Sequence, residues 1–313
     1  MSGILSILIG SAAGTVAGSG GGASSYVPTQ KAIFGFGGTP SYTSITNLVT
    51  SLGVVSSNVA GIGTVREGLS AAGYGTDKAI FGYGNGGPYF SLTNLVSNLG
   101  VVSVDVAGVG TARRGTAAAG YSTDKAIFGF GRNEPVQNMT NLVSNTGVVS
   151  SDTAGVGTAR TQSSGVGYGT GKAIIGYGYN GSVQASMTNL ISDTGTVSTD
   201  TAGVGTARSQ LAAASYGNDK AIFAFGYTGS FVSTKNLVSN TGVVAADVSG
   251  VGTARSGLAA AGYGADKSIF GYGYTGGYVA TTNLVSNVGV VASDVAGVGQ
   301  VREGLAAAGY SLT

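Results

Sequence analysis

The stretch KAIFGYG, Lys78 to Gly84, decides the fold because it recurs along the chain at an almost constant interval. Its copies are separated by 47, 47, 47, 48 and 47 residues, and they start at Lys31, Lys78, Lys125, Lys172, Lys220 and Lys267. A second marker, the arginine of GTAR and its variants, recurs with the same period at Arg66, Arg113, Arg160, Arg208, Arg255 and Arg302. The chain therefore contains six copies of one unit, which predicts a repeat architecture.

Each unit contains four short strand-like segments, separated by clusters of Gly, Asn, Asp, Thr and Ser that favour turns. In one complete unit these segments are LSAAGYG (Leu69 to Gly75), KAIFGYG (Lys78 to Gly84), LTNLVSN (Leu92 to Asn98) and GVVSVDVAG (Gly100 to Gly108). No long run has the 3.6-residue periodicity of a helical repeat. Four strands in about 47 residues are typical of one β-propeller blade. The sequence therefore predicts an all-β fold, a six-bladed β-propeller with four-stranded blades.

The sizes of the side chains assign two of these strands to places in a blade. The segment LAAAGY, Leu305 to Tyr310, has nothing larger than alanine in its middle, which suits a crowded innermost strand around a narrow axis. The KAIFGYG segment places apolar side chains on both faces, which suits a sheet packed between two neighbouring sheets.

The two ends of the repeat array are complementary halves of one blade. The first unit begins with its Lys-led strand at Lys31 and lacks an LAAAGY segment, whereas the last unit ends just before a Lys-led strand is due. We therefore expect Leu305 to Ser311 to form the innermost strand of the first blade, beside Lys31 to Gly37. This pairing would leave no blade edge open.

One unit is a residue longer than the others, and the extra residue locates a loop. The separation between the strand-leading lysine and the asparagine of TNL is 17 from Lys172 to Asn189, but 16 from Lys78 to Asn94. The extra residue therefore lies between the second and third strands, in the segment that also varies most between units. Insertions and variation are expected in surface loops.

Composition excludes several classes of chemistry. The 313 residues include 58 glycines and no cysteine or histidine or tryptophan, so disulfides, thiol nucleophiles, imidazole bases and the usual zinc, copper and haem ligands are all missing. We expect no metal and no cofactor. The formal net charge of +2 comes from 15 basic and 13 acidic residues scattered along the chain. No basic stripe is present to hold a phosphate backbone, so nucleic acid is not an expected partner.

The units resemble the kelch repeat of kelch and galactose-oxidase-type propellers. The matching features are the arginine before the first strand, the aromatic-glycine end of the second strand, as in FGFGG from Phe34, and the turn sequence NTGVV. The units depart from kelch in having no tryptophan and, in most copies, no second glycine. The likeness covers residues 31–313. The Gly/Ala-rich composition of the units also resembles that of propeller repeats in virion structural proteins from marine tailed phages.

The resemblance carries a fold but no activity. A galactose-oxidase-like site needs histidine and a cysteine-modified tyrosine as copper ligands, and this chain has neither histidine nor cysteine. A sialidase-like site would use a cluster of arginines, but a catalytic site is asymmetric, whereas the arginines here occupy equivalent positions in successive units. We therefore expect that the protein is not an enzyme.

An acidic residue precedes most of these arginines by eight positions, at Asp105, Asp152, Asp200, Asp247 and Asp294, with Asn58 in the first unit. These residues could form a ring of calcium or ligand sites. The interpretation we favour is a local one, an Asx turn or an ion pair that fixes the link between blades.

The variable loops carry the candidate binding residues. Aromatic side chains fall in or beside these loops at Tyr42, Tyr89, Phe90, Tyr179, Tyr227, Phe231, Tyr274 and Tyr278. Aromatic loops on a rigid scaffold suit stacking against sugars or packing against protein. The alternative is that these rings only cover blade edges.

The segment 1–30 lies outside the repeats and has no charged side chain. Its apolar part is shorter than the ~20 residues that span a bilayer, and no Lys or Arg supplies the basic start of a signal peptide. We expect it to dock into a larger assembly through Ile4, Leu5, Ile7, Leu8 and Ile9, with the propeller of residues 31–313 displayed outside. A signal peptide and a membrane anchor are the alternatives.

Two hypotheses for function follow. The first is a non-enzymatic virion structural or adhesion protein of a tailed phage, whose partners are other virion proteins, further copies of the chain and a cell-surface glycan. The second is a secreted, extracellular carbohydrate-binding propeller. An intact Met1 in purified particles favours the first hypothesis, and a cleaved N-terminus on the mature protein favours the second.

Overall fold

The computed structural model describes residues 30–312, and these residues form twenty strands and no helix. Eighteen strands make six three-stranded antiparallel sheets. The first sheet contains β20 (Ala306–Tyr310), β1 (Lys31–Gly35) and β4 (Thr46–Val49), and the second contains β5 (Ser70–Tyr74), β6 (Lys78–Gly82) and β7 (Thr93–Val96). The third contains β8 (Ala117–Tyr121), β9 (Lys125–Arg132) and β10 (Val136–Val143).

The remaining three sheets repeat the same strand order. The fourth contains β11 (Ser164–Tyr168), β12 (Lys172–Tyr179) and β13 (Gln184–Ile191), and the fifth contains β14 (Ala212–Tyr216), β15 (Lys220–Tyr227) and β16 (Phe231–Val238). The sixth contains β17 (Ala259–Tyr263), β18 (Lys267–Tyr274) and β19 (Tyr278–Val285). The short strands β2 (Gly38–Thr39) and β3 (Ser41–Tyr42) pair with each other.

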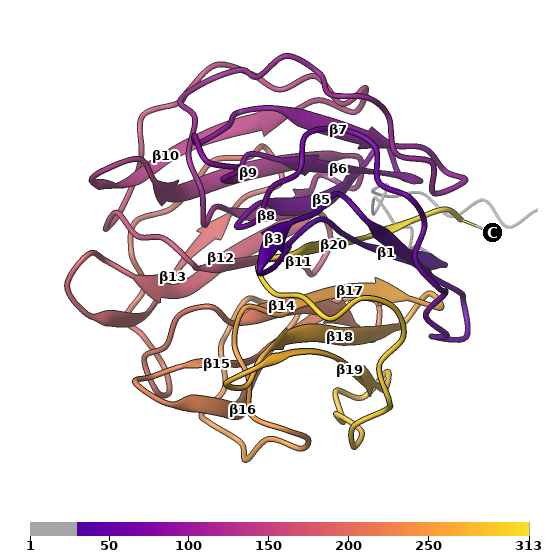
Figure 1. Cartoon of the computed structure of the whole chain (residues 1–313). Coiled ribbons are helices and arrows are strands. Elements are labelled where there is room, and N and C mark those ends of the chain that lie inside the picture. Colours follow the sequence, from indigo (N-terminus) through magenta and orange to yellow (C-terminus); the bar gives the residue numbers. More distant parts are fainter. Residues whose placement is uncertain (1–29, 313) are drawn as a thin grey trace, which may run out of the picture.

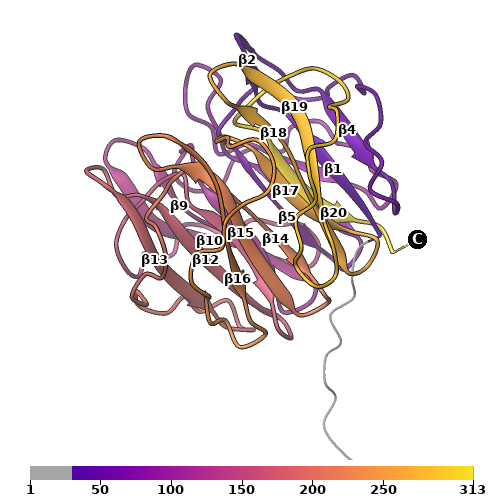
Figure 2. The same ribbon diagram turned by 90° about the horizontal axis from the view of Figure 1, so that it is seen from below.

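The small-residue strands lie against one another at the centre of the molecule. Each contacts the next in the order β5, β8, β11, β14, β17 and β20, and β20 contacts β5. Seen from below, the sixth sheet lies beside β1 and β4 of the first (Figure 2). This arrangement is compatible with a β-propeller.

Each sheet is buried on both faces because its middle strand carries large apolar side chains on both. In β6, Ile80 faces the third sheet and Phe81 faces the first, and both are 0% exposed. Phe81 meets Phe36 edge to face, with ring centroids 5.2 Å apart. Full burial of such a side chain contributes about 1.5–3 kcal/mol. The repeated KAIFGYG segment therefore supplies the core between every pair of neighbouring sheets.

The strand near the C-terminus completes the first sheet, as the sequence predicts. Strand β20 pairs antiparallel with β1, from Lys31 opposite Tyr310 to Gly35 opposite Ala306. Figure 1 shows this yellow strand beside the indigo one, although the two lie at opposite ends of the described chain.

The predicted fourth strand is wrong, because the segment after β7 forms only two isolated bridges, from Val102 to Val96 and from Val106 to Thr93. Side-chain hydrogen bonds explain the difference. The Ser103 hydroxyl accepts the Leu95 N–H at 3.0 Å, in place of a ladder carbonyl. The other sheets repeat these bridges. Each sheet therefore has three strands and an irregular outer segment.

The extra residue of the longer unit lies where the sequence places it. The turn between β12 and β13 spans residues 180–183, whereas the equivalent turn between β15 and β16 spans residues 228–230. We call the turns between the second and third strands of the sheets, such as these two, the hairpin turns.

The predicted docking residues, Ile4, Leu5, Ile7, Leu8 and Ile9, lie outside the described residues. Within residues 30–312, no helix is long and apolar enough to cross a membrane.

Candidate functional site

The repeated arginines are fully buried links between sheets. Arg113 Nε donates to the Phe130 carbonyl at 2.7 Å, Nη1 to the Thr111 carbonyl at 2.9 Å, and Nη2 to Asn141 Oδ1 at 2.7 Å. Its guanidinium lies 4.3 Å from the ring centroid of Tyr83 in the preceding sheet. All six of these arginines are 0% exposed.

Burial leaves no repeated arginine on the surface for a substrate. Desolvation lowers the pKa of Arg66, Arg160 and Arg255 to about 10, despite a nearby carboxylate in each case. Each guanidinium directs its donors at carbonyl and amide oxygens of the protein itself. The arginines act as separate structural links, one for each pair of neighbouring sheets.

The repeated aspartates serve the same links. The Asp105 carboxylate accepts hydrogen bonds from Thr64 N at 3.0 Å, Thr64 Oγ1 at 2.6 Å and Asn94 Nδ2 at 2.9 Å, and it lies 3.8 Å from Arg66 Nη1. Burial raises the pKa of this carboxyl, but the hydrogen bonds outweigh burial and hold it below the usual range. The contacts support the local interpretation. Within residues 30–312, no group of three or more acidic side chains is placed to hold a metal ion.

A cavity of about 620 Å³ lies at the end of the sheets that carries the hairpin turns. Six residues of its lining are joined by backbone hydrogen bonds in a closed cycle. Each N–H donates to the carbonyl of the equivalent residue in the preceding sheet, at 2.6–3.0 Å, in the order Gly68, Gly115, Gln162, Gln210, Gly257, Gly304 and back to Gly68. All six have a φ between 55° and 63°. We call these residues the backbone ring.

One half of the cavity wall is aromatic. Of the predicted loop residues, Tyr179, Tyr227, Phe231 and Tyr274 line the cavity. The rings of Tyr227 and Phe231 are 5.7 Å apart, and those of Phe231 and Tyr274 are 5.9 Å apart, so one continuous aromatic contact crosses from the fifth sheet to the sixth. Each of these rings is half-buried, so each keeps some surface open to solvent.

The other half of the wall is charged. The residue that follows each buried arginine lines the cavity, and the six are Glu67, Arg114, Thr161, Ser209, Ser256 and Glu303. Thr161, Ser209 and Ser256 form β-bridges with Tyr179, Tyr227 and Tyr274. The equivalent β-bridges of the first three sheets contain no aromatic residue, and they join Glu303 to Gly38, Glu67 to Asn85 and Arg114 to Arg132. The first three sheets therefore supply the charged half, and the last three supply the aromatic half.

The environment disfavours the charged form of both glutamates in the charged half. Burial raises the pKa of Glu67, and the nearby positive charge of Arg114 counteracts this in part. Burial also raises the pKa of Glu303, and the negative charge of Glu67 raises it further. The Arg114 guanidinium lies 5.8 Å from the ring centroid of Tyr89.

The other four predicted aromatic residues do not line this cavity. Tyr42 accepts a hydrogen bond from Asn85 Nδ2 at 2.9 Å, Tyr89 lies under Arg114, Phe90 packs against Gly86, and Tyr278 lies 5.4 Å from the ring of Tyr274. These contacts agree with the edge-covering alternative, and a role in binding stays a prediction for these four residues.

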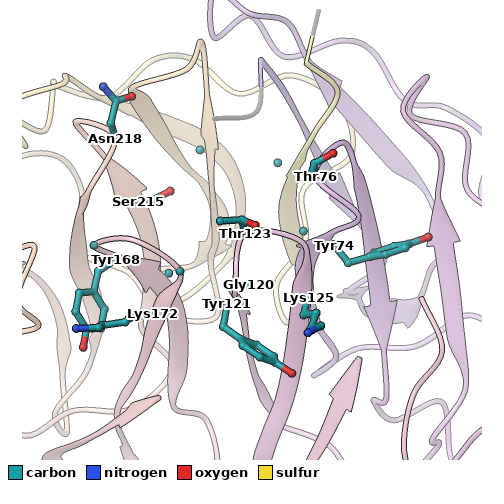
Figure 3. Close-up of a pocket in the computed structure, with 16 residues that line it drawn as sticks. Tyr74, Thr76, Gly120, Tyr121, Thr123, Lys125, Tyr168, Lys172, Ser215 and Asn218 are labelled. Carbon is teal, nitrogen blue, oxygen red and sulfur yellow. The ribbon is translucent and has the colours of Figure 1, made fainter. Parts of the chain in front are cut away.

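A smaller cavity of about 130 Å³ lies at the opposite end of the inner strands (Figure 3). Its tyrosines are structural, because Tyr74, Tyr121 and Tyr168 are each 4% exposed. Tyr74, for example, packs on Gly147 in a turn of the next sheet. The larger cavity, with half-buried aromatic and charged side chains, is therefore the stronger candidate site.

Sequence reasoning missed Glu67, Arg114 and Glu303, although a signal was present. Each follows a repeated arginine, at a position where the other three units have a small hydroxyl residue. A charge that breaks the pattern of a repeat indicates a feature that the fold does not require.

No protein-family model matches the chain, and no curated protein matches its sequence.

Proposed function

We propose that the six sheets are the blades of one closed six-bladed β-propeller. The pairing of β20 with β1 and the backbone ring support this proposal. A second cycle of backbone hydrogen bonds at the opposite end supports it too. It joins the turns of neighbouring sheets through N–H groups of Gly75, Ser122, Gly169, Gly217, Gly264 and Ser311, which donate to carbonyls of Asp124, Gly171, Asp219, Asp266, Gln30 and Asp77.

The function that we propose is non-enzymatic recognition of a cell-surface glycan by the cavity at the hairpin turns. The aromatic contact formed by Tyr227, Phe231 and Tyr274 is the observation that carries it. Aromatic rings stack on the apolar face of a sugar, and neighbouring polar groups bind its hydroxyls. A cavity of about 620 Å³ falls in the range of small-ligand sites, about 300–1,000 Å³.

The setting that we propose is a virion, in which the protein is a structural or adhesion component on the capsid, neck or tail. Two features support it: the resemblance of the units to propeller repeats of tailed-phage proteins, and the uncharged segment 1–30 with its apolar residues from Ile4 to Ile9. Deleting residues 2–24 should leave a folded propeller that binds glycan but no longer joins its assembly. Assembly of the truncated protein would contradict the docking role.

A secreted carbohydrate-binding propeller is the second candidate. The observation that favours it is that every residue of the cavity wall lies within residues 67–305, so the site needs no assembly partner. Mass spectrometry of the native protein separates the candidates, because an intact Met1 in purified particles supports the virion role and a cleaved N-terminus supports secretion.

A glycan array on the isolated protein tests recognition itself. Phe231→Ala should weaken binding of any captured glycan on the order of tenfold, because it removes the centre of the aromatic contact. Leu99→Ala is the matched control, since Leu99 is 78% exposed and belongs to a turn at the opposite end of its sheet. Recognition is ruled out at this cavity if the array captures nothing, or if both variants bind like the unmodified protein.

A further inference from the structure

The charged half of the cavity contains carboxylates that no described residue neutralises by direct contact. Glu67 and Glu303 occupy equivalent positions in adjacent sheets and line the same cavity. Within residues 30–312, neither carboxylate takes part in a hydrogen bond or a salt bridge, whereas all five repeated aspartates do both. The fold satisfies its repeated acids and leaves these two open to the cavity.

Nothing in the architecture requires this arrangement. In the fourth, fifth and sixth sheets the same position holds Thr161, Ser209 or Ser256, and the backbone ring continues through all six sheets. Two half-buried carboxylates beside each other also disfavour the folded state, because like charges repel and burial penalises each one. Their unfavourable placement is explained if they serve a ligand.

We infer that the charged half binds a protonated primary amine, so that the preferred glycan carries a free amino sugar. This inference rests on the proposed glycan recognition. An ammonium group between Glu67 and Glu303 would give both carboxylates a charge-assisted hydrogen bond and relieve their repulsion. The sugar ring would then extend toward Tyr227, Phe231 and Tyr274, which line the aromatic half of the same cavity.

The balance of charge favours an amine over the other substituents of sugars. A sugar carboxylate could pair with Arg114, but it would also face two carboxylates of its own sign, and the other arginine of the lining, Arg132, is already paired with Glu134 at 2.6 Å. A hydroxyl or an acetamide would accept or donate hydrogen bonds without relieving the repulsion between the glutamates. Arg114 already has the face of Tyr89 near its guanidinium and the charge of Glu67 nearby. Burial raises the pKa of both glutamates, and a cation held beside them would counteract this effect.

The test compares two probes that differ in one group, glucosamine oligomers with free amines and N-acetylglucosamine oligomers of the same length. Calorimetry should show binding of the free amine on the order of tenfold tighter or more. Glu67→Gln and Glu303→Gln, which keep the side-chain shape, should each reduce this ratio toward one. Asp193→Asn removes the same charge from an exposed position beyond the other end of β13 and should leave the ratio unchanged.

Arg114→Gln protects the test against trivial loss of folding. Removing the positive charge of Arg114, which acts on Glu67, should tighten binding of the free amine, an effect that a damaged protein cannot produce. Equal binding of the two probes, or tighter binding of the acetylated one, overturns the inference. If the array captures only glycans without amines, glycan recognition stands and the amine inference falls, whereas an empty array refutes the proposed function itself.

Discussion

Arg302 Nη2 donates a 2.7 Å hydrogen bond to Asn47 Oδ1, which joins two buried side chains that are 255 positions apart in the sequence. The same guanidinium lies 4.2 Å from the ring centroid of Tyr272, in the sixth sheet. One side chain therefore holds the end of the repeat array to both its first and its last sheet. The equivalent arginines join each of the other neighbouring pairs, so the same polar contact recurs beside the apolar core throughout the array.

Arg208→Lys should destabilise the protein by about 3 kcal/mol or more. Lysine cannot reproduce the planar set of donors that Arg208 directs at Phe225 O, Thr206 O and Asn236 Oδ1, so buried acceptors would lose their partners. Urea unfolding measures the change. Arg132→Lys is the control, because the Arg132 side chain is 36% exposed and its two hydrogen bonds to Glu134 lie at the surface, so it should change stability by less than about 1 kcal/mol. Similar effects for the two variants would show that the buried links are not major contributors.

Asp105→Asn should flatten the loss of stability in acid. Hydrogen bonds hold the folded-state pKa of Asp105 below its usual value, so its contribution is complete above the unfolded pKa of about 3.9 and is lost as pH falls through the folded pKa. Near pH 7 the variant should lose about 1 kcal/mol, since an amide oxygen still accepts hydrogen bonds. Asn58 already does so in the first unit, where it accepts the Asn47 Nδ2 and Gln300 N donors at 3.1 Å.

The measurement is urea unfolding at several pH values between neutral and strongly acidic conditions. Asp193→Asn is the control for the loss of one negative charge, because Asp193 is exposed and lies outside these links. If Asp105→Asn and the unmodified protein lose stability equally steeply in acid, the aspartate links do not contribute through their charge.

Most of the sheet architecture could be predicted from the sequence because the repeat reports it six times. The two-sided apolar pattern around Phe81 predicts the middle strand, and the alanines of residues 306–308 predict the inner one. The outer segment differs from the prediction. Valines at alternate positions suggest a strand, but Ser103 forms a side-chain hydrogen bond to the neighbouring backbone, and a pattern of hydrophobicity does not register such a contact.

The candidate site was predicted only in its aromatic half. Tyr179, Tyr227, Phe231 and Tyr274 line the cavity because the hairpin turns bring them to one end of the sheets. Their loop neighbours do not, since their side chains are used by contacts such as the one between Tyr42 and Asn85. Which loop side chain faces the cavity depends on packing between sheets, and spacing along the chain does not determine it.

Gly115→Ala should destabilise the protein more than Gly68→Ala, although both residues belong to the backbone ring and have nearly equal φ, 62° and 61°. Each alanine would cost about 1–2 kcal/mol for its left-handed conformation. At Gly68 the nearest atom to the new Cβ is Arg114 Cβ at 3.5 Å, an ordinary contact. At Gly115 the new Cβ would overlap Thr161 Oγ1, which must rotate away from its hydrogen bonds.

Urea unfolding of these two alanine variants isolates the effect of crowding, since the backbone strain is common to both. The difference should be at least about 1 kcal/mol. Equal stabilities would show that the ring has room at Gly115 and is less tightly packed than its hydrogen bonds indicate.

Deleting residues 304–313 should open the first sheet and cause association or unfolding. The deletion exposes the edge of β1 and removes Ala306, Ala308 and Tyr310 from the core that surrounds Phe81. Size-exclusion chromatography with light scattering should detect oligomers, because an unpaired strand edge and an uncovered apolar face both favour association. A shorter deletion of residues 312–313 is the control and should remain monomeric, since Leu312 lies beyond β20 and is 40% exposed.

A synthetic peptide of residues 304–313, added to the longer deletion variant, should restore the monomer by pairing with β1. A stable, peptide-independent monomer without β20 would refute the proposed closure of the propeller through this strand.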